Sequence, residues 1–234
     1  MSLSPTSPVL LSIHLLEAVK MKRPVPSQLD ELAQLSPSHL AQALHTDSMK
    51  QVFWVNVYNS FILLFLRENP ELYDNRKAFF TEPRFRVAGQ ELSFDDVEHG
   101  FLRRSKIKLS LGYVTKPLVG DFEKMMRVNA VDWRMHMALN CGAGSCPPIE
   151  IYRPETLEAQ LDRRARAFLA TSTQYDAASN TVTVTALMQW FRADFGGPDG
   201  IKAILRRFDL IPPGANPTIK YDDYSWELAL ENFA

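Results

Sequence analysis

The 234-residue sequence has little of several features that would place it in a simple class. Two cysteines are too few for the disulfide framework of a small secreted domain. A formal net charge of −1, from 26 basic and 27 acidic residues, gives no global positive field, so we predict no nucleic-acid partner. The composition, 46% hydrophobic and 23% charged, is instead that of a globular protein with a sizeable core.

Long apolar runs and targeting signals are also missing. The most hydrophobic stretch, residues 52–66, contains two asparagines and falls short of the roughly 20 residues that a bilayer span needs, so we predict no membrane span. The N-terminus has no basic start followed by a long apolar run and a small-residue cleavage site. The cytoplasm is therefore the default compartment, although a chain whose signal had been removed would look the same.

Helical patterns dominate the chain, and the few strand patterns are scattered. We predict helices over most of residues 1–49, over 50–67, from a cap at Ser93 to about Arg104, and over 153–171, 186–197 and 200–208. We also predict a hairpin at 84–94, a strand at 133–141 and a short strand at 180–185. The fold class is therefore α+β, a mostly helical single domain with a small, mainly antiparallel sheet. A helical extension, residues 1–49, is predicted to pack on a domain that spans residues 50–234.

Both cysteines lie in the segment DWRMHMALNCGAGSCPPIEIY, residues 132–152. Its alternating pattern predicts a strand that places Arg134, His136 and Asn140 on one face. The glycines that follow permit positive φ, so the N–H groups of Gly142–Ser145 can turn toward an anion. A thiol near the start of a turn opened by Pro147 would have a lowered pKa. The pattern predicts a nucleophilic cysteine beside an oxyanion pocket, whereas the structural alternative is a glycine-rich turn with two buried thiols.

Two histidines are candidate bases for that thiol. On a continuous strand His136 and Cys141 face opposite sides, which favours His99 of the segment DDVEHGFLRR instead. Asp95 shares a helix face with His99, and a carboxylate there would fix the tautomer of the ring. The same spacing also fits a surface pair without a role in catalysis.

Two asparagines, Asn56 and Asn59, lie on one face of the apolar helix predicted at 50–67, beside Trp54. A buried amide without a partner costs roughly 1–3 kcal/mol, so both need hydrogen bonds. They either brace a neighbouring loop or bind a ligand.

A metal site is a third interpretation of the same segment. His136, Cys141 and Cys146 follow the spacing H-x4-C-x4-C, whereas structural zinc sites usually begin with a closer pair and need a fourth ligand. A redox pair usually has the spacing C-x-x-C rather than C-x4-C. We therefore predict no metal and no other cofactor, and whether the two thiols form a disulfide stays open.

Several motifs together resemble the domain of unknown function 547 family. They are FWVNVYNSF, LSFDDVEHGFLRR, DWRMHMALNCGAGSCPPIEIY, LEAQLDRRARAFL, ALMQWFRADFG and YDDYSWELA, in that order. The resemblance covers about residues 50–230, and it implies shared polar residues at the following positions: Trp54, Asn56, Tyr58, Asn59, Glu98, His99, Arg103, Asp132, Arg134, His136, Cys141, Ser145 and Cys146. The family was named for its unknown function, so the resemblance implies a site without naming a reaction.

The leading hypothesis is a thiol-dependent hydrolase or acyl transferase of the papain or transglutaminase style, acting on an unknown small molecule or peptide. Its nucleophile would be Cys141, or else Cys146. The base would be His99 or His136, oriented by Glu98 or Asp132. Substrate-binding candidates are Trp54, Asn56, Asn59, Arg134, Asn140, Gly142 and Ser145. The alternatives are a non-catalytic ligand- or protein-binding domain with a structural Cys-Gly loop, and a His/Cys metal site.

Overall fold

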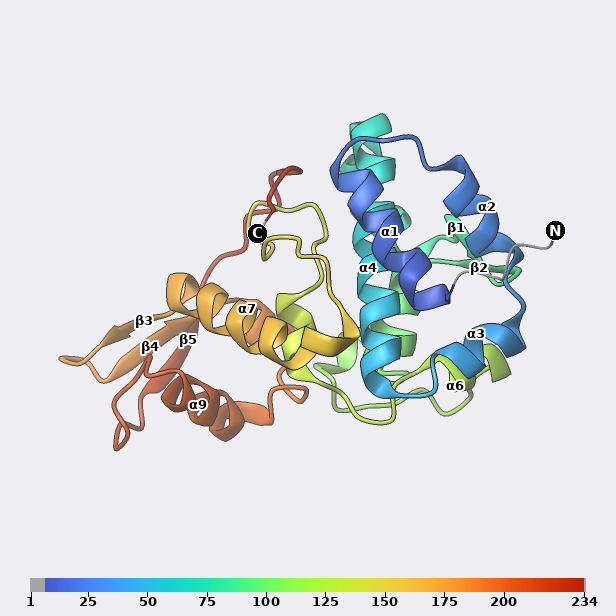
Figure 1. Cartoon of the computed structure of the whole chain (residues 1–234). Helices are drawn as coiled ribbons and strands as arrows, with labels where there is room; N and C mark the ends of the chain where they lie inside the picture. The colour runs from blue at the N-terminus through green and yellow to red at the C-terminus, as the bar shows by residue number, and fades with distance from the viewer. Residues whose placement is uncertain (1–6, 234) are drawn as a thin grey trace.

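The structure, a computed structural model that describes residues 7–233, is mostly helical with two small sheets, which confirms the α+β prediction (Figure 1). The α-helices are α1 (Pro8–Lys20), α2 (Pro26–Gln34), α3 (Pro37–Ala43), α4 (Asp47–Glu68), α5 (Arg76–Thr81), α6 (Asp121–Met126), α7 (Leu157–Ser172), α8 (Leu187–Trp190) and α9 (Gly197–Arg207). Shorter helical segments are η1 (Pro70–Asn75), η2 (Asp96–Leu102), η3 (Lys108–Ser110), η4 (Trp133–Met137) and η5 (Pro154–Thr156). None of the helices in the described part of the chain is long and apolar enough to cross a bilayer.

Helix α4 is the central element of the larger lobe. Thr46 caps it by accepting a hydrogen bond from the Met49 N–H, and nearly every side chain from Lys50 to Leu63 is buried. A helix that is apolar on all sides must be enclosed by other elements. Helix α1 lies along it on one side and η2 packs on another. The asparagines of α4 are therefore in the interior of the protein.

The strands form two separate sheets rather than one. The predicted hairpin is confirmed as β1 (Phe85–Val87) paired antiparallel with β2 (Gln90–Leu92), and positive φ angles at Ala88 and Gly89 make its turn. In the second sheet β4 (Thr181–Val184) pairs antiparallel with β3 (Gln174–Asp176) and parallel with β5 (Thr218–Tyr221).

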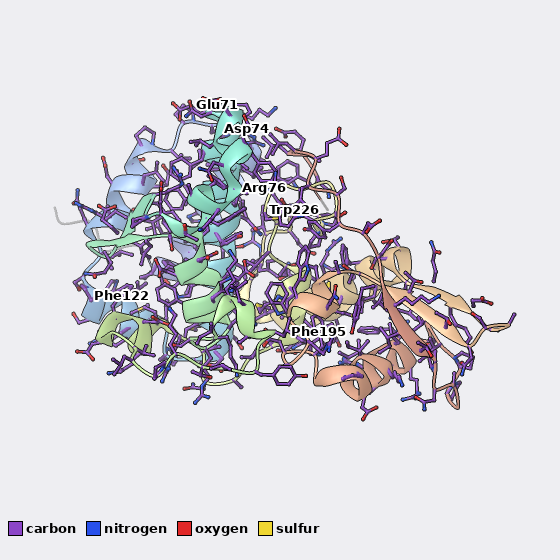
Figure 2. The ribbon with its side chains drawn as sticks, turned by 180° about the vertical axis from the view of Figure 1, so that it is seen from behind. Glu71, Asp74, Arg76, Phe122, Phe195 and Trp226 are labelled. Carbon is purple, nitrogen blue, oxygen red and sulfur yellow. The ribbon has the colours of Figure 1, made fainter. Side chains whose placement is uncertain are left out.

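Two hydrophobic cores lie in two lobes. The larger surrounds α1 and α4, and the smaller lies between α7, α9 and the second sheet. Phe122 lies in the larger lobe and Phe195 in the smaller (Figure 2). After β5 the chain returns to the larger lobe, where the Arg76 guanidinium lies 5.2 Å from the centre of the Trp226 ring. The C-terminal segment thus joins the two lobes.

The predicted strand at residues 133–141 is wrong, because the structure has the 3-10 helix η4 there. Asp132 caps it through the Arg134 N–H, and residues 7–233 contain no neighbouring strand to pair with it. Instead, Asn59 of α4 donates to the Ala138 carbonyl and accepts from the Asn140 N–H. These side-chain bonds satisfy backbone groups that a sheet would otherwise have to satisfy.

Two other helices differ from the prediction: the one that begins after Ser93 is a π-helix, and the one at 186–197 is shorter. The Ser93 cap is confirmed, since its hydroxyl accepts from the Asp96 N–H while the Asp96 carboxylate accepts from the Ser93 N–H. The helix it starts becomes the π-helix η2, a form often found at functional sites. The helix predicted over residues 186–197 is only the short α8, followed by turns.

Candidate active site

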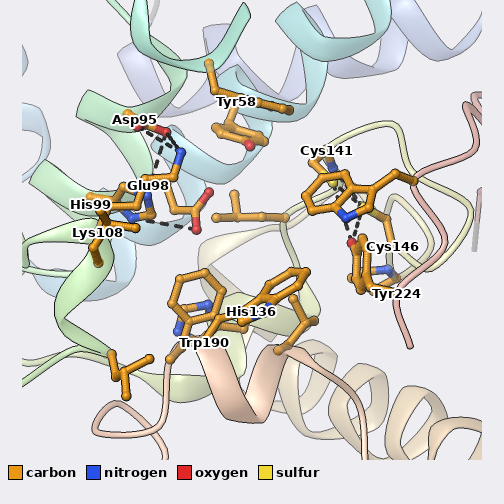
Figure 3. Close-up of a pocket in the computed structure, with 18 residues that line it drawn as sticks. Tyr58, Asp95, Glu98, His99, Lys108, His136, Cys141, Cys146, Trp190 and Tyr224 are labelled. Carbon is orange, nitrogen blue, oxygen red and sulfur yellow. Dashed lines mark hydrogen bonds and ion pairs between the residues drawn. The ribbon is translucent and has the colours of Figure 1, made fainter. Parts of the chain in front are cut away.

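A pocket of about 360 Å³ lies between the two cores. Figure 3 shows Tyr58, Glu98 and His99 on one side and Cys141, Cys146 and Tyr224 on the other. The other lining residues are Phe80, Asp95, Lys108, Leu109, Leu111, His136, Leu139, Pro147, Leu187, Trp190, Phe191 and Trp226. Five of the predicted residues, Glu98, His99, His136, Cys141 and Cys146, therefore share one cavity.

The two thiols are in contact at one end of the pocket. Their sulfur atoms are 2.7 Å apart, and the Tyr224 hydroxyl lies 3.1 Å from the Cys146 Sγ and 3.5 Å from the Cys141 Sγ. The hydrogen bond from Cys146, followed by that from Tyr224, lowers the pKa of Cys141 to about 7. Burial raises the pKa of Cys146. Cys141 is therefore the more acidic thiol of the pair, and Cys146 keeps its proton and donates it to Cys141.

The loop between the cysteines does not form the predicted anion site. The N–H groups of Gly142, Gly144 and Ser145 donate to Asn140 Oδ1, the Glu227 carbonyl and the Ser225 carbonyl. Ser145 also uses its hydroxyl to accept from the Ser225 N–H. These donors are thus engaged inside the protein, and Gly144 and Ser145, together with the Gly142 carbonyl that accepts from the Ala229 N–H, fix the loop to the C-terminal segment.

Arg103 determines the tautomer of His99. Its Nη1 lies 3.0 Å from Nδ1 of His99, and a guanidinium only donates, so Nδ1 is the acceptor and Nε2 carries the proton. The Nε2 atom lies 3.6 Å from Asp95 Oδ1, which confirms the shared face. Burial, followed by the charge of Arg103, lowers the pKa of His99 far below its usual value. His99 is therefore a neutral ring without a free lone pair.

Asp194 holds the other histidine. Its Oδ2 lies 3.0 Å from His136 Nε2 and 2.5 Å from Arg103 Nε, and the Asp194 and Arg103 side chains are each 1% exposed. The His136 ring stacks on Phe191 with centroids 4.0 Å apart. Because a carboxylate accepts, Nε2 of His136 carries the proton. Burial lowers the pKa of His136, and the bond to Asp194 opposes this shift.

Neither histidine bonds to a sulfur among the described residues, and Figure 3 places His99 and Cys141 on opposite sides of the pocket.

The group with a pKa suited to proton transfer is Glu98. Burial raises the pKa of Glu98 to about 7, while the charge of Arg103 opposes the shift. Its carboxyl lies inside the pocket, 3.7 Å from His99 Nδ1. Glu98 is therefore poised between its acid and base forms at neutral pH.

The asparagines of α4 brace loops. Asn56 donates to the Tyr152 carbonyl and accepts from the Tyr152 N–H, and Asn59 bridges Ala138 and Asn140 as described above. Asn140 in turn donates to the Pro147 carbonyl. Trp54 is fully buried against Phe101 and does not line the pocket. These residues build the site without lining it.

Arg134 and Asp132 also lie outside the pocket. Arg134 bonds to Asp132, Glu158 and Asp162, which joins η4 to α7. Asp132 therefore does not orient a histidine. No group of three or more His, Cys, Asp or Glu side chains within residues 7–233 is arranged to hold a metal ion.

Three site residues were missed from the sequence: Trp190, Asp194 and Tyr224. All of them lie more than forty residues beyond the cysteines, in segments without a local chemical pattern. Tyr224 and Asp194 belong to the motifs YDDYSWELA and ALMQWFRADFG, which the family resemblance had already picked out. That resemblance was the only signal for them.

Comparison with known proteins gives one match. The family model described as "Protein of unknown function, DUF547" matches residues 42–169, which include α4, η2 and the cysteine loop. No curated protein and no solved structure gives a significant match.

Proposed function

This chain belongs to the DUF547 family, whose description names no reaction, and we propose from its site that it is a thiol-dependent hydrolase or acyl transferase with Cys141 as the nucleophile. The supporting observation is that the Cys141 thiol lines a ligand-sized pocket and has a pKa of about 7, lowered by hydrogen bonds from Cys146 and Tyr224. A thiolate is then present at neutral pH without a histidine partner.

The proposed reaction uses groups that line the pocket. The Cys141 thiolate attacks a carbonyl carbon, a carbon–sulfur bond forms, and the bond to the leaving group breaks. Glu98 in its acid form gives its proton to the leaving group and, as the carboxylate, then takes one from the attacking water or acceptor. The oxygen or other nucleophilic atom of that second molecule bonds to the acyl carbon as the carbon–sulfur bond breaks, which releases the product and returns Cys141 to the thiolate. His99 is unsuited to this task, because Arg103 occupies its only lone pair. The ligand in the pocket would lie between Glu98 and Cys141.

A small activated ester such as p-nitrophenyl acetate tests this proposal. We expect the wild-type protein to form an acyl adduct on Cys141, detected by mass spectrometry, and to release nitrophenol catalytically. Cys141→Ala should lose both, whereas Cys146→Ala should still be acylated, more slowly, because Cys141 has lost a hydrogen-bond donor. Equal turnover by Cys141→Ala and wild type would refute the proposal.

One observation favours a second function, a non-catalytic binding domain with a structural cysteine loop. The loop is tied to the C-terminal segment through Gly144 and Ser145, as a structural element would be. This alternative predicts that Cys141→Ala lowers the melting temperature markedly and that no acyl adduct forms. A stable Cys141→Ala protein without activity would support catalysis instead.

A further inference from the structure

We propose that the pocket selects an uncharged, largely apolar ligand, an ester or thioester of a short aliphatic or single-ring aromatic acid, and disfavours carboxylates. The reactive ester rests on the proposed function, whereas the preference for a neutral ligand rests on the pocket alone.

The walls of the pocket are mostly apolar. Leu111 and Leu139 line it together with the aromatic rings of Phe80, Trp190 and Trp226, and Trp190 and Trp226 stack with centroids 5.7 Å apart. Binding an apolar ligand against these side chains removes apolar surface from water on both partners. The hydrophobic effect therefore favours a ligand with little polar surface.

Lys108 in the pocket lining and Arg103 behind it are already paired. Lys108 at the pocket wall bonds to both oxygens of Asp95, at 2.9 and 3.0 Å. Arg103 is buried beneath Phe191 and bonds to Asp194 and His99. A carboxylate ligand would lose its hydration without gaining an unpaired Lys or Arg among the residues that line the pocket.

Glu98 adds a second barrier to an anion. Its carboxyl lies inside the pocket, and the figure shows it on the side opposite the thiols (Figure 3). A ligand that fills the pocket from the thiols to the opposite wall lies close to Glu98, so a ligand carboxylate there would be repelled by the ionised form of Glu98. A neutral carbonyl avoids this repulsion and can accept a hydrogen bond from the protonated form.

The volume limits the size of the ligand. About 360 Å³ is near the lower end of small-molecule pockets. A short acyl chain or a single aromatic ring fits this space, whereas a folded protein segment does not. The sequence predicted a small molecule or a peptide as the ligand, and the pocket volume favours the small molecule.

Three ligands with the same chain test the preference: octanamide, octanoate and octylammonium. Their binding to Cys141→Ser, which cannot turn over, is measured by calorimetry at pH 8, where octanoate is ionised. We expect octanamide to bind at least about tenfold more tightly than octanoate, which the ionised Glu98 repels, whereas octylammonium, which Glu98 attracts, should bind more tightly than octanoate. Equal or tighter binding of octanoate than of octanamide would overturn the proposal, as would failure of all three to bind.

Two variants identify the cause and the place of binding. Glu98→Gln should tighten octanoate binding several-fold more than it tightens octanamide binding, whereas the exposed Glu82→Gln should alter neither. Leu111→Glu should abolish octanamide binding, and Leu118→Glu, outside the pocket, should preserve it. Octanoate affinity unchanged by Glu98→Gln would contradict the electrostatic argument. None of these binding measurements requires turnover. If octanamide binds selectively while Cys141 is unreactive, the proposed reaction is refuted and the ligand preference stands.

Discussion

The sulfur atoms of Cys141 and Cys146 lie 2.7 Å apart, and the Cys141 N–H donates to the Cys146 sulfur at 3.0 Å. The partner of each thiol is therefore the other thiol. The sequence offers His99 and His136 as candidate bases for Cys141. In the structure Arg103 bonds to the His99 ring and Asp194 bonds to the His136 ring. Hydrogen bonds from a second thiol and from a tyrosine lower the pKa of Cys141.

Tyr224→Phe should raise the pKa of Cys141, because it removes a hydrogen-bond donor to the thiolate pair. We expect alkylation of Cys141 by iodoacetamide at pH 7 to slow about three- to tenfold. The exposed Tyr113→Phe is the control and should react like wild type. Unchanged rates in Tyr224→Phe would show that the hydroxyl does not stabilise the thiolate.

The contact between the thiols predicts rapid formation of a disulfide with a small disulfide oxidant such as oxidised glutathione. Cys141 attacks the oxidant, one glutathione thiol leaves, and Cys146 then displaces the second. The protein should lose the mass of two hydrogen atoms and become resistant to alkylation. Cys146→Ser should instead stop at the mixed disulfide. A wild-type protein that also stops there would contradict the arrangement of the two sulfurs.

Glu98 should make the stability of the protein depend on pH. Its pKa is raised by burial to about 7, so the stability associated with its neutral form is complete below its ordinary pKa of 4.5 and is lost as pH rises through 7. Between pH 4.5 and 8, wild type should lose about 1–3 kcal/mol of unfolding free energy relative to Glu98→Gln. Urea unfolding at both pH values measures this difference. Parallel pH dependence in the two proteins would mean that Glu98 ionises without penalty.

Asp194→Asn should destabilise the fold, since it leaves the guanidinium of Arg103 buried without its anion. We expect a loss of about 3–5 kcal/mol in chemical unfolding. Asp162→Asn, at a 40% exposed ion pair with Arg134, is the matched control and should cost less than about 1 kcal/mol. Similar losses in the two variants would contradict a central role for Asp194.

The sequence predicted local elements better than it predicted the site. Capping by Ser93 and the hairpin at 85–92 depend on neighbours in the chain, and both are confirmed. The strand predicted at 133–141 is wrong because an alternating pattern does not show whether a partner strand is available. Asn59, about eighty residues earlier, bonds to the Ala138 carbonyl and the Asn140 N–H instead. Asn59 could be recognised as needing a partner, but only the fold shows that the partner is a loop.

The sequence likewise identified residues of the candidate site but did not predict which of them contact one another. Glu98, His99, His136 and both cysteines were identified because titratable side chains in apolar segments stand out in a sequence. Their pairing was not predicted, because Asp194 and Tyr224 approach from distant segments of the chain. The preference for His99 over His136 as the base rested on a strand that does not exist.

The rate of alkylation of the native protein by iodoacetamide, followed from pH 5 to 10 with peptide mapping of the modified thiol, tests the central claim most directly. Cys141 should be modified before Cys146, with a midpoint near pH 7, and the protein should stay folded. If neither thiol reacts in the native protein, or if Cys141 reacts only with the midpoint of an ordinary thiol near pH 8.5, Cys141 is not an activated nucleophile.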